Sequence, residues 1–459
     1  MSLHIIILAA GQGKRMHSKT PKVLHPLGGK PMLLRVIETA QALNPEKIHV
    51  IIGHGGALLR QALGELPIHW VEQAEQLGTG HAVMQALPYI ASTSRVLILS
   101  ADVPLIQTNT LQALLNHGDS ESVPLSLLLA KVVDPTGLGR IIRSQNHQIS
   151  AIVEEKDADE SQRQINEIYS GICYVSAAAL HRWLPALSRA NAQGEYYLTE
   201  IISMAVRENL PIASLHAQDP NEILGVNNRL QLQQLERIWQ KWLATKLMLA
   251  GVSLADANRI DIRGELHCGE DVFIDVNTLF EGTVSLGDGC SIAPNCILKN
   301  VTVGANSEIL ANTVLENCTV GEHCQIGPFA RIRPGTQVAA HCKIGNFVET
   351  KNASFDTGSK ANHLSYLGDV KLGKHVNIGA GTITCNYDGA NKHQTIIEDG
   401  VFVGSDTQLV APVTVGENAT IGAGSTIRRN VPAGELTLTE SKQKTIYGWQ
   451  RPQKHPSTE

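Results

Sequence analysis

Two groups of residues in this chain of 459 have the types and spacing that chemistry requires. The first is the glycine-rich turn Ala9-Ala10-Gly11-Gln12-Gly13, closely followed by the cations Arg15 and Lys22. Such a turn can bring backbone N–H groups against phosphates, and fixed cations stabilise the charge that develops during nucleotidyl transfer. The spacing does not fit a P-loop, which needs Gly-Lys-Ser/Thr at a longer spacing. It does not fit the dinucleotide fingerprint either, because Met16 stands where the third glycine belongs. An ordinary tight turn and a solvated Lys22 are the alternatives.

Two later segments extend this chemistry. Gln73 stands before Gly78-Thr79, and its amide offers a donor and an acceptor to the edge of a base. In the alternative, this segment is a loop in which Thr79 merely caps a helix. Asp102 follows the apolar run 96–99, and ligands of open α/β sheets bind at the carboxyl ends of strands. Because Mg²⁺ is usually held by few carboxylates together with substrate phosphates, Asp102 is a candidate magnesium ligand.

The second group lies in the C-terminal half. Arg333, Lys351 and Tyr366 each carry a donor for a phosphate. His363 is a candidate general base, because imidazole titrates near neutral pH. Any one of the 18 histidines is by default a surface or hydrogen-bonded residue. The prediction therefore rests on the constellation and not on His363 alone.

The first group needs a scaffold that brings distant segments together. Short apolar runs alternate with helical stretches, with strands at 4–8, 48–52, 96–99 and 125–129 and helices at 32–43 and 78–87. This alternation predicts a parallel, doubly wound α/β domain over residues 1–227. Residues 228–250 form a linker helix, in which Trp239 and Trp242 fall at helical spacing and serve packing.

The C-terminal half carries an internal repeat of six residues. Large apolar residues recur at this period, with one-residue slips, at Ile274, Phe280, Leu286, Ile292, Leu298, Val303, Ile309, Leu315, Val320, Ile326, Ile332, Val338, Ile344, Leu372, Ile378, Val403, Leu409, Val415, Ile421 and Ile427. Three such hexapeptides close one triangular coil of a parallel β-helix, and stacked coils bury the core. We predict this fold for residues 251–437 and a polar tail for 438–459.

Interruptions of the repeat at 345–370 and 382–401 predict loops on the face of this solenoid, carrying His363, Tyr366, Asn386 and Tyr387. Five cysteines stand two positions before a repeat residue: Cys290, Cys296, Cys318, Cys324 and Cys342. Because side chains alternate along a strand, we expect these thiols to pack in the core rather than bind zinc, for which no Cys-x-x-Cys pair is present. The pair Cys324 and Cys342 should stack one coil apart.

Composition narrows the classes of protein. With 38 Lys+Arg and 43 Asp+Glu the net charge is −5. Nothing therefore indicates a protein dedicated to binding nucleic acid or an anionic membrane. No apolar run approaches the length of a membrane span, and the chain enters its first strand directly, so we expect no signal peptide. Eight cysteines without an export signal indicate reduced thiols in a cytoplasmic protein.

Four segments in order resemble the uridylyltransferase half of the bifunctional bacterial GlmU family, namely 8–16 with Pro21-Lys22, 73–82, 102–104 and 225–229. The second half resembles the hexapeptide acyltransferases, and most closely the acetyltransferase half of that family, through 346–349, 379–382, 385–389 and 402–406. The likeness covers nearly the whole chain. It implies an N-acetylglucosamine-1-phosphate uridylyltransferase and a glucosamine-1-phosphate N-acetyltransferase on one chain.

For the first half, the resemblance implies UTP as co-substrate and Mg²⁺ as cofactor. The implied nucleotide and sugar contacts are Leu8, Ala9, Ala10, Gly11, Gln73, Gly78, Thr79, Ser100, Ala101, Gly139 and Glu154. Arg15 and Lys22 are the implied catalytic contacts to the phosphates, and Asp102 with Asn227 the implied metal ligands.

For the second half, the resemblance implies acetyl-CoA as co-substrate, His363 as the base for the substrate amine and Glu349 as the residue that orients it. The implied sugar-phosphate contacts are Arg333, Lys351, Tyr366 and Asn377, and the implied acetyl-CoA contacts are Ala380, Asn386, Tyr387, Ser405 and Ala423. The Ala380 N–H would stabilise the oxyanion. The resemblance also implies a left-handed β-helix and a homotrimer whose active sites draw on neighbouring subunits.

Three places depart from the family pattern. Ser100-Ala101 replaces a more usual Tyr-Gly or Ser-Gly. Tyr169 replaces a sugar-contacting asparagine, which leaves sugar selectivity open. Glu440 stands where a CoA-binding arginine is usual, so we expect rearranged CoA binding, with Arg428, Arg429 or Lys442 as substitutes. Beside the bifunctional enzyme, two further hypotheses are a nucleotidyltransferase with a regulatory or assembly β-helix, and a non-enzymatic scaffold that binds a sugar nucleotide.

Overall fold

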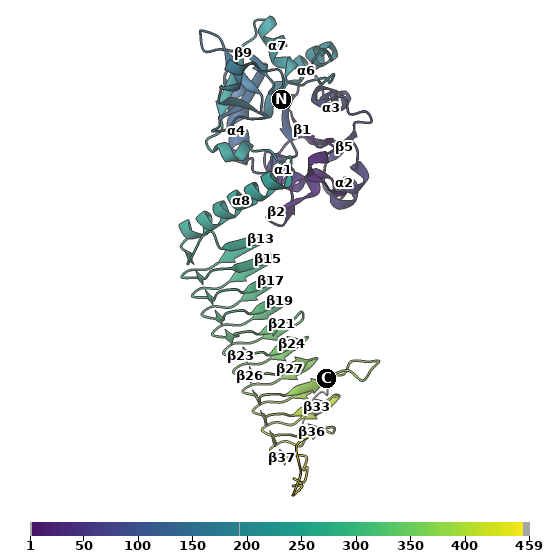
Figure 1. The fold of residues 1–459 in the computed structure, drawn as a ribbon, viewed down its shortest axis with the longest axis vertical. Helices are drawn as coiled ribbons and strands as arrows, with labels where there is room; N and C mark the ends of the chain where they lie inside the picture. Colours follow the sequence, from purple (N-terminus) through teal and green to yellow (C-terminus); the bar gives the residue numbers. More distant parts are fainter. Residues whose placement is uncertain (1, 192, 453–459) are drawn as a thin grey trace, which may run out of the picture. The chain divides into compact units, whose positions relative to one another are not determined.

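The computed structural model describes residues 2–191 and 193–452 of the chain, which forms two compact units, Met1–Leu243 and Ala244–Glu459. A mixed β-sheet forms the centre of the first unit (Figure 1). Its main strands lie in the order β11 (Ile212–His216), β7 (Leu125–Lys131), β10 (Glu167–Ser176), β6 (Arg95–Ser100), β1 (Leu3–Leu8), β4 (Lys47–Ile52) and β5 (His69–Glu72). The hairpin of β8 (Arg140–Arg143) and β9 (Ile149–Val153) extends from β10.

Helices cover both faces of this sheet, as a doubly wound domain requires. Along β1, Ile5 and Ile7 point into one apolar cluster and Ile6 into the other, because side chains alternate along a strand. One cluster is closed by α1 (Met32–Gln41), α2 (Gly56–Leu63) and α4 (Thr108–Ser120), the other by α3 (Thr79–Ala86), α6 (Ala177–Trp183) and α7 (Glu200–Arg207). The short elements of this unit are η1 (Lys14–Met16), η2 (Lys22–Leu24), β2 (Pro26–Leu27), β3 (Lys30–Pro31), η3 (Leu87–Tyr89), α5 (Glu160–Arg163), η4 (Leu184–Ala186) and η5 (Pro220–Ile223).

The expectation of a parallel sheet holds for most of the strands, but not for β10 or for the β8–β9 hairpin. Strand β1 is parallel to β4 and β6, whereas β10 is antiparallel to both β6 and β7. Parallel neighbours need a crossover connection, usually a helix. The chain instead returns from β7 through the β8–β9 hairpin, so β10 enters the sheet in the opposite direction.

The linker helix is observed as α8 (Arg229–Leu249). Its two tryptophans serve packing, as predicted. The guanidinium of Arg35 lies 3.9 Å from the ring centroid of Trp239, whose own ring contacts that of Trp242. Leu235 is buried in an apolar cluster of the first unit, together with Met16 and Leu27.

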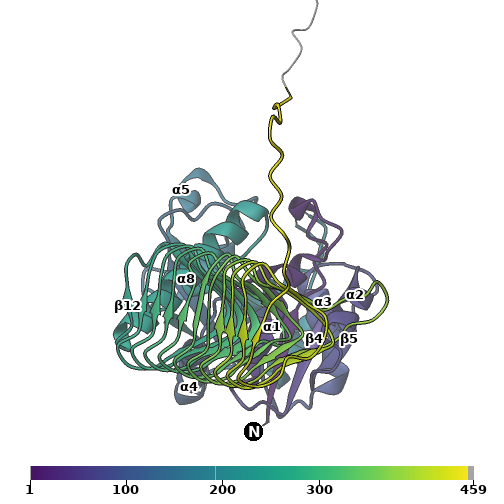
Figure 2. The same ribbon diagram turned by 90° about the horizontal axis from the view of Figure 1, so that it is seen from below.

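The second unit is a parallel β-helix, seen from the side in Figure 1 and along the stack in Figure 2. Its first face is a column of short strands: β12 (Ser253–Leu254), β14 (Phe273–Ile274), β16 (Ser291–Ile292), β18 (Glu308–Ile309), β20 (Gln325–Ile326), β23 (Lys343–Asn346), β26 (Lys360–His363), β29 (Asn377–Ile378), β32 (Phe402–Val403), β35 (Thr420–Ile421) and β37 (Leu436–Thr437). Each strand pairs in parallel with the next strand of the column.

The other two faces begin as one run of long strands, β13 (Ile260–Cys268), β15 (Thr278–Leu286), β17 (Ile297–Val303) and β19 (Val314–Val320). Beyond β19 they separate. The second face continues as β21 (Arg331–Ile332), β24 (Glu349–Lys351), β27 (Tyr366–Gly368), β30 (Ile383–Cys385), β33 (Gln408–Val410) and β36 (Thr426–Ile427). The third continues as β22 (Gln337–Val338), β25 (Ser354–Phe355), β28 (Val370–Leu372), β31 (Thr395–Ile397) and β34 (Val413–Val415).

The predicted repeat residues form the core of this unit, and all of them are buried. The five cysteines that precede repeat residues are buried too, as predicted. The first predicted loop is wrong, because residues 345–370 continue the coils through β24, β25, β26 and β27. Leu367 is buried there like the other repeat residues, and the buried Thr350, Phe355 and Ala361 take the place of the expected Ile, Val or Leu. In the second predicted loop, only residues 386–394, between β30 and β31, leave the coil.

Candidate active sites

A cavity of about 480 Å³ lies at the carboxyl ends of β1 and β6. The predicted nucleotide contacts that line it are Leu8, Ala9, Ala10, Gly11, Lys22, Gln73, Gly78, Thr79, Ser100 and Asp102. Ala101 is buried beside the last two, and its N–H donates to the carbonyl of Leu8 over 3.1 Å. The cavity therefore lies where neighbouring parallel strands end at one edge of the sheet, which is the ligand position of open α/β folds.

Lys22 joins the two predicted metal ligands at this cavity. Its Nζ lies 2.5 Å from Asp102 Oδ2 and 3.4 Å from Asn227 Oδ1. The other carboxylate oxygen of Asp102 accepts a hydrogen bond from the Ser100 hydroxyl at 2.7 Å. The N–H of Val226 donates to the Asp102 carbonyl at 2.9 Å, which brings Asn227 to Asp102 across 125 residues of sequence. A carboxylate and an amide oxygen that already share one cation are a donor set that fits Mg²⁺.

Gln73 and the turn after it form the side of the cavity. The Gln73 side chain is buried, and its amide nitrogen lies 3.1 Å from both the Gly78 carbonyl and His81 Nδ1. Gly78 has φ of +110°, and a Cβ there would approach the Tyr196 carbonyl to 2.6 Å, so glycine is required. The interpretation of Thr79 as a helix cap is wrong, because Gly78 is the N-cap of α3 and the Thr79 hydroxyl accepts from the Leu198 N–H at 3.0 Å.

The predicted sugar contacts Gly139 and Glu154 lie next to each other at the ends of the β8–β9 hairpin, just before β8 and just after β9. The Gly139 carbonyl accepts from the Tyr169 N–H at 3.0 Å, and a Cβ on Gly139 would lie 3.5 Å from the Glu154 carboxylate. Burial raises the pKa of Glu154, which accepts a hydrogen bond from the Thr199 hydroxyl at 3.4 Å. Tyr169 is buried, and burial raises its pKa well above the usual range, so its phenol stays neutral.

The turn after the glycines also brings a cation to the cavity wall that was not predicted from the sequence. Both Lys14 and Arg15 lie on η1, but Lys14 lines the cavity whereas Arg15 is exposed and not among the lining residues. Gln12 and Gln76 also line it and are joined by a hydrogen bond of 2.8 Å. The segment that carries Gln73 was singled out from the sequence, so Gln76 was within reach of that signal.

In the second unit, predicted catalytic and acetyl-CoA residues form a column along one edge. His363, Ala380, Ser405 and Ala423 occupy equivalent positions in four successive coils, where the first face turns into the second. Backbone hydrogen bonds connect these turns, including the Asp406 N–H to the Ala380 carbonyl at 2.7 Å. His363 is exposed at the end of β26, so its imidazole is accessible to a substrate at this edge.

The predicted phosphate contacts lie on the second face. Arg333 Nη1 donates to Glu349 Oε1 at 2.7 Å, and Glu349 pairs in register with Tyr366 on the next coil. The Tyr366 hydroxyl lies over Gly368, where a Cβ would approach it to 2.4 Å, and Gly368 is the register partner of Lys351. This arrangement gathers a guanidinium, an ammonium and a phenol at one place.

Lys392, which sequence reasoning missed, adds a cation to this group. It lies in the 386–394 loop, and its contact lowers the pKa of Lys351, with a smaller contribution from Arg333. Crowded cations of this kind suit a phosphate ligand. The interruption of the repeat at 382–401 pointed to this loop, but nothing in the spacing singled out Lys392 within it.

Three predicted residues lie elsewhere on the β-helix. Asn377 is on the first face, where its register partners are Lys360 and Phe402. Asn386 and Tyr387 follow β30 at the edge between the second and third faces. The Asn386 amide donates to Asp369 Oδ2 at 2.5 Å, and the Tyr387 hydroxyl donates to the Gly389 carbonyl at 2.6 Å. One chain therefore does not bring these three residues to the His363 edge.

Three family models match parts of the chain: a MobA-like NTP transferase domain at residues 5–142, a GMPPB C-terminal domain at 262–355 and the bacterial transferase hexapeptide at 394–429. A protein described as "Bifunctional protein GlmU" from Legionella pneumophila (strain Corby) is 66% identical over 457 residues, which is 99% of each chain. Proteins of the same description from Marinobacter nauticus and Nitrosospira multiformis are 56% and 55% identical, over 98% and 99% of this chain and 99% and 98% of theirs. This chain belongs to the GlmU family.

Membership of the GlmU family makes the chain a bifunctional transferase, with a nucleotidyltransferase unit followed by a hexapeptide acetyltransferase unit. Its substrates are small molecules of nucleotide-sugar chemistry. The bifunctional hypothesis is thus confirmed at the level of the family. In the described part of the chain, no helix is both long enough and apolar enough to cross a membrane.

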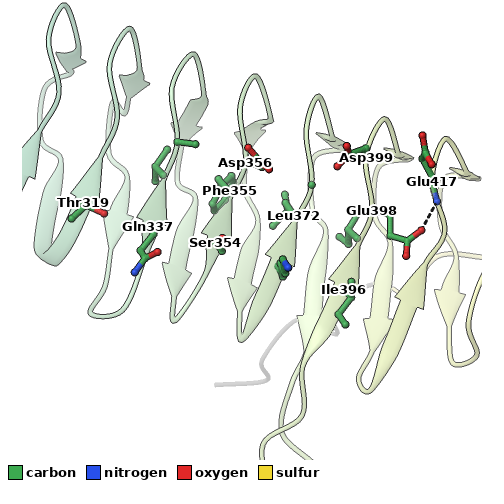
Figure 3. Close-up of a pocket in the computed structure, with 15 residues that line it drawn as sticks. Thr319, Gln337, Ser354, Phe355, Asp356, Leu372, Ile396, Glu398, Asp399 and Glu417 are labelled. Carbon is green, nitrogen blue, oxygen red and sulfur yellow. Dashed lines mark hydrogen bonds between the residues drawn. The ribbon is translucent and has the colours of Figure 1, made fainter.

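A groove of about 820 Å³ runs along the third face of the β-helix (Figure 3). Its lining includes Gln337, Ser354 and Ile396 from the strands and Asp356, Asp399 and Glu417 from the turns. Glu398 accepts a hydrogen bond from the Glu417 N–H at 2.9 Å across this lining. None of the residues predicted for acetyl transfer lines the groove, so the candidate acetyltransferase site is the His363 edge.

Proposed function

We propose that the chain acetylates glucosamine-1-phosphate with acetyl-CoA, and transfers UMP from UTP to N-acetylglucosamine-1-phosphate to give UDP-N-acetylglucosamine and pyrophosphate. The observation that carries the proposal is the meeting of Lys22, Asp102 and Asn227 at a cavity formed by the glycine turn and Gln73. That combination offers backbone donors, a cation and metal-binding oxygens to a triphosphate, and an amide to a base.

In the first unit, the turn Leu8-Ala9-Ala10-Gly11 would enclose the nucleotide, with Ser100 and Ala101 behind it. Gln73, Gly78 and Thr79 would contact uracil, and Gly139 and Glu154 the sugar. Arg15 and Lys22 would contact the phosphates. Asp102 and Asn227 would hold Mg²⁺, which when bound neutralises charge on the triphosphate oxygens.

The uridylyl transfer itself is an in-line displacement. An oxygen of the sugar phosphate forms a bond to the α-phosphorus of UTP while the bond from that phosphorus to the bridging oxygen breaks, and pyrophosphate leaves. Little covalent chemistry falls to the protein, so catalysis consists of positioning and charge stabilisation. Lys22 lines the cavity beside Asp102 and suits the second role.

In the second unit, His363 would take a proton from the glucosamine-1-phosphate amine while that nitrogen attacks the acetyl carbonyl carbon. The C–S bond then breaks, the proton held by His363 passes to the leaving sulfur so that CoA leaves as the thiol, and the Ala380 N–H would stabilise the oxyanion in between. Arg333, Lys351, Tyr366 and Asn377 would hold the sugar phosphate, and Glu349 would position Arg333. Asn386, Tyr387, Ser405 and Ala423 would line the acetyl-CoA path.

A homotrimer would complete this second site. Asn377 and the Arg333 group face different ways on one chain, and the loop carrying Asn386 and Tyr387 leaves from another edge. A neighbouring copy of the β-helix would bring these surfaces to His363. Both co-substrates and the eight free cysteines suit a cytoplasmic enzyme.

Two assays on one preparation test the proposal. Thiol release from acetyl-CoA with glucosamine-1-phosphate reports the second unit, and pyrophosphate release from UTP with N-acetylglucosamine-1-phosphate and Mg²⁺ reports the first. We expect His363→Ala to lower thiol release by about 100-fold or more and to leave pyrophosphate release unchanged, with the reverse for Asp102→Ala. A wild-type protein that lacks either activity would contradict the proposal.

A further inference from the structure

The ammonium group of Lys22 stands where the proposed magnesium site would place its ion. It lies 2.5 Å from Asp102 Oδ2 and 3.4 Å from Asn227 Oδ1, the two oxygens assigned to the metal. The Lys22 and Asp102 side chains are only 12% and 21% exposed, so water weakens their attraction far less than that of a surface pair. The ion pair therefore satisfies the ligand pair without any metal.

We propose that Lys22 acts as an internal counter-ion, which occupies the Asp102–Asn227 pair in the free enzyme and releases it to Mg²⁺ only when nucleotide phosphates arrive. Mg²⁺ binds oxygen ligands at about 2.0–2.1 Å, so the ammonium cannot keep both of its contacts once the ion is bound. Two adjacent positive charges also repel one another. The inference rests on the proposed function, because it takes its metal ligands from it.

The structure also shows why the nucleotide should control this exchange. The Lys22 side chain packs against the glycine turn, and a Cβ on Gly13 would lie 2.7 Å from Lys22 Cβ. That turn lines the same cavity through Ala9, Ala10 and Gly11. A triphosphate bound there gives the displaced ammonium a new anionic partner. Metal and nucleotide then raise each other's affinity, as thermodynamic linkage requires.

The test measures Mn²⁺ binding to the full-length protein, from the loss of the free-ion EPR signal, with and without UTP. We expect the wild type to bind Mn²⁺ weakly at this site without UTP, and Lys22→Met to bind it at least about tenfold more tightly, because a positive charge beside the ligands is gone. Lys22→Gln should behave like Lys22→Met, and Lys22→Arg like the wild type. Adding Asp102→Asn to Lys22→Met should abolish the gain, which assigns the ion to this site.

Lys14→Met is the matched control, because Lys14 lines the same cavity without bonding to Asp102. If Lys14→Met tightens Mn²⁺ binding as much as Lys22→Met does, the effect is general electrostatics and the proposal is overturned. Folded Lys22 variants that bind Mn²⁺ no more tightly than the wild type also overturn it. Failure of the wild type to bind Mn²⁺ even with UTP would instead contradict the magnesium site of the proposed function.

Discussion

The guanidinium of Arg333 donates to the carboxylate of Glu349, with 2.7 Å between Nη1 and Oε1. This contact joins two adjacent coils of the β-helix, since Arg333 follows β21 and Glu349 begins β24. The family resemblance implied that Glu349 orients His363. The observed hydrogen bond instead joins Glu349 to Arg333, one of the residues predicted to bind the sugar phosphate. We therefore expect Glu349 to act mainly on substrate binding.

Glu349→Gln should raise the KM for glucosamine-1-phosphate by about three- to fivefold and leave kcat of acetyl transfer nearly unchanged. The effect is modest because both side chains are more than a third exposed, at 37% and 42%, and exposed pairs contribute little. Steady-state kinetics of thiol release check this, with pyrophosphate release as the internal control. A large fall in kcat with a displaced pH profile would show that Glu349 acts through His363.

Three histidines lie side by side on β1, β4 and β5 of the first unit, away from both candidate sites. His4 Nδ1 lies 3.1 Å from His49 Nε2, and His49 Nδ1 lies 3.0 Å from His69 Nδ1. Burial, followed by repulsion from the neighbouring histidines, lowers the pKa of His49 to about 3, and burial also lowers those of His4 and His69. The folded protein therefore keeps these three histidines neutral.

Because these histidines stay neutral in the folded protein, we predict a loss of stability in mild acid. Below about pH 6.5 the unfolded chain binds protons at these histidines, whereas folded His49 does not until about pH 3, so the free energy of unfolding falls as the pH falls. For His49 alone the slope approaches about 1.4 kcal/mol per pH unit. His49→Phe should flatten the decline in Tm of the first unit between pH 7.5 and 5.5. The exposed His54, just after the same strand, offers the control His54→Gln, which should leave the slope unchanged.

The fold could largely be predicted because its apolar patterns are strong. Every large apolar residue of the hexapeptide ladder is buried, and the two-sided burial of β1 follows from its continuous apolar run. The pattern failed at 345–370, because Thr350 and Ala361 occupy core positions without the large aliphatic side chain that marks the repeat. The coil accommodates Thr350 and Ala361 because their backbone makes the same parallel strand pairing as the other repeats.

The sites were harder to predict than the fold. Whether Lys14 or Arg15 faces the cavity depends on left-handed backbone conformations at Gly13 and His17, with φ of 61° and 48°, which set the direction of the turn. Residue types cannot reveal that choice. Nor could they reveal that Asn377 lies on another face than Arg333, since the face of a residue depends on every slip in the repeat before it.

Thiol accessibility offers a test of the β-helix core. Cys173, Cys290, Cys296, Cys318, Cys324 and Cys342 are buried, and only Cys268 and Cys385 are partly exposed. Burial raises the pKa of Cys296 to about 11 and that of Cys318 to about 12, and a thiol reacts as its thiolate. At pH 8 we expect a disulfide reagent to label no more than two of the eight thiols of the native protein quickly, and all eight after denaturation. Cys385→Ser should lower the native count, and rapid labelling of more than two would show that the coils are loosely packed.

Gly13→Ala should separate the two activities without touching a substrate contact of the second unit. Gly13 has φ of +61°, and an added Cβ would lie 2.7 Å from Lys22 Cβ, so the substitution strains the turn and displaces Lys22 from its position at the nucleotide cavity. A displacement of about 1 Å at a charge-stabilising group can cost about 100-fold in rate, and we expect pyrophosphate release to fall by about 10- to 100-fold. Thiol release should stay at the wild-type level, because no contact of the His363 edge changes.

Gly137→Ala is the matched control, since Gly137 also has a positive φ of +81° but nothing lies within 4 Å of its added Cβ. Equal losses in the two variants would show that backbone strain alone, rather than the displacement of Lys22, lowers the rate.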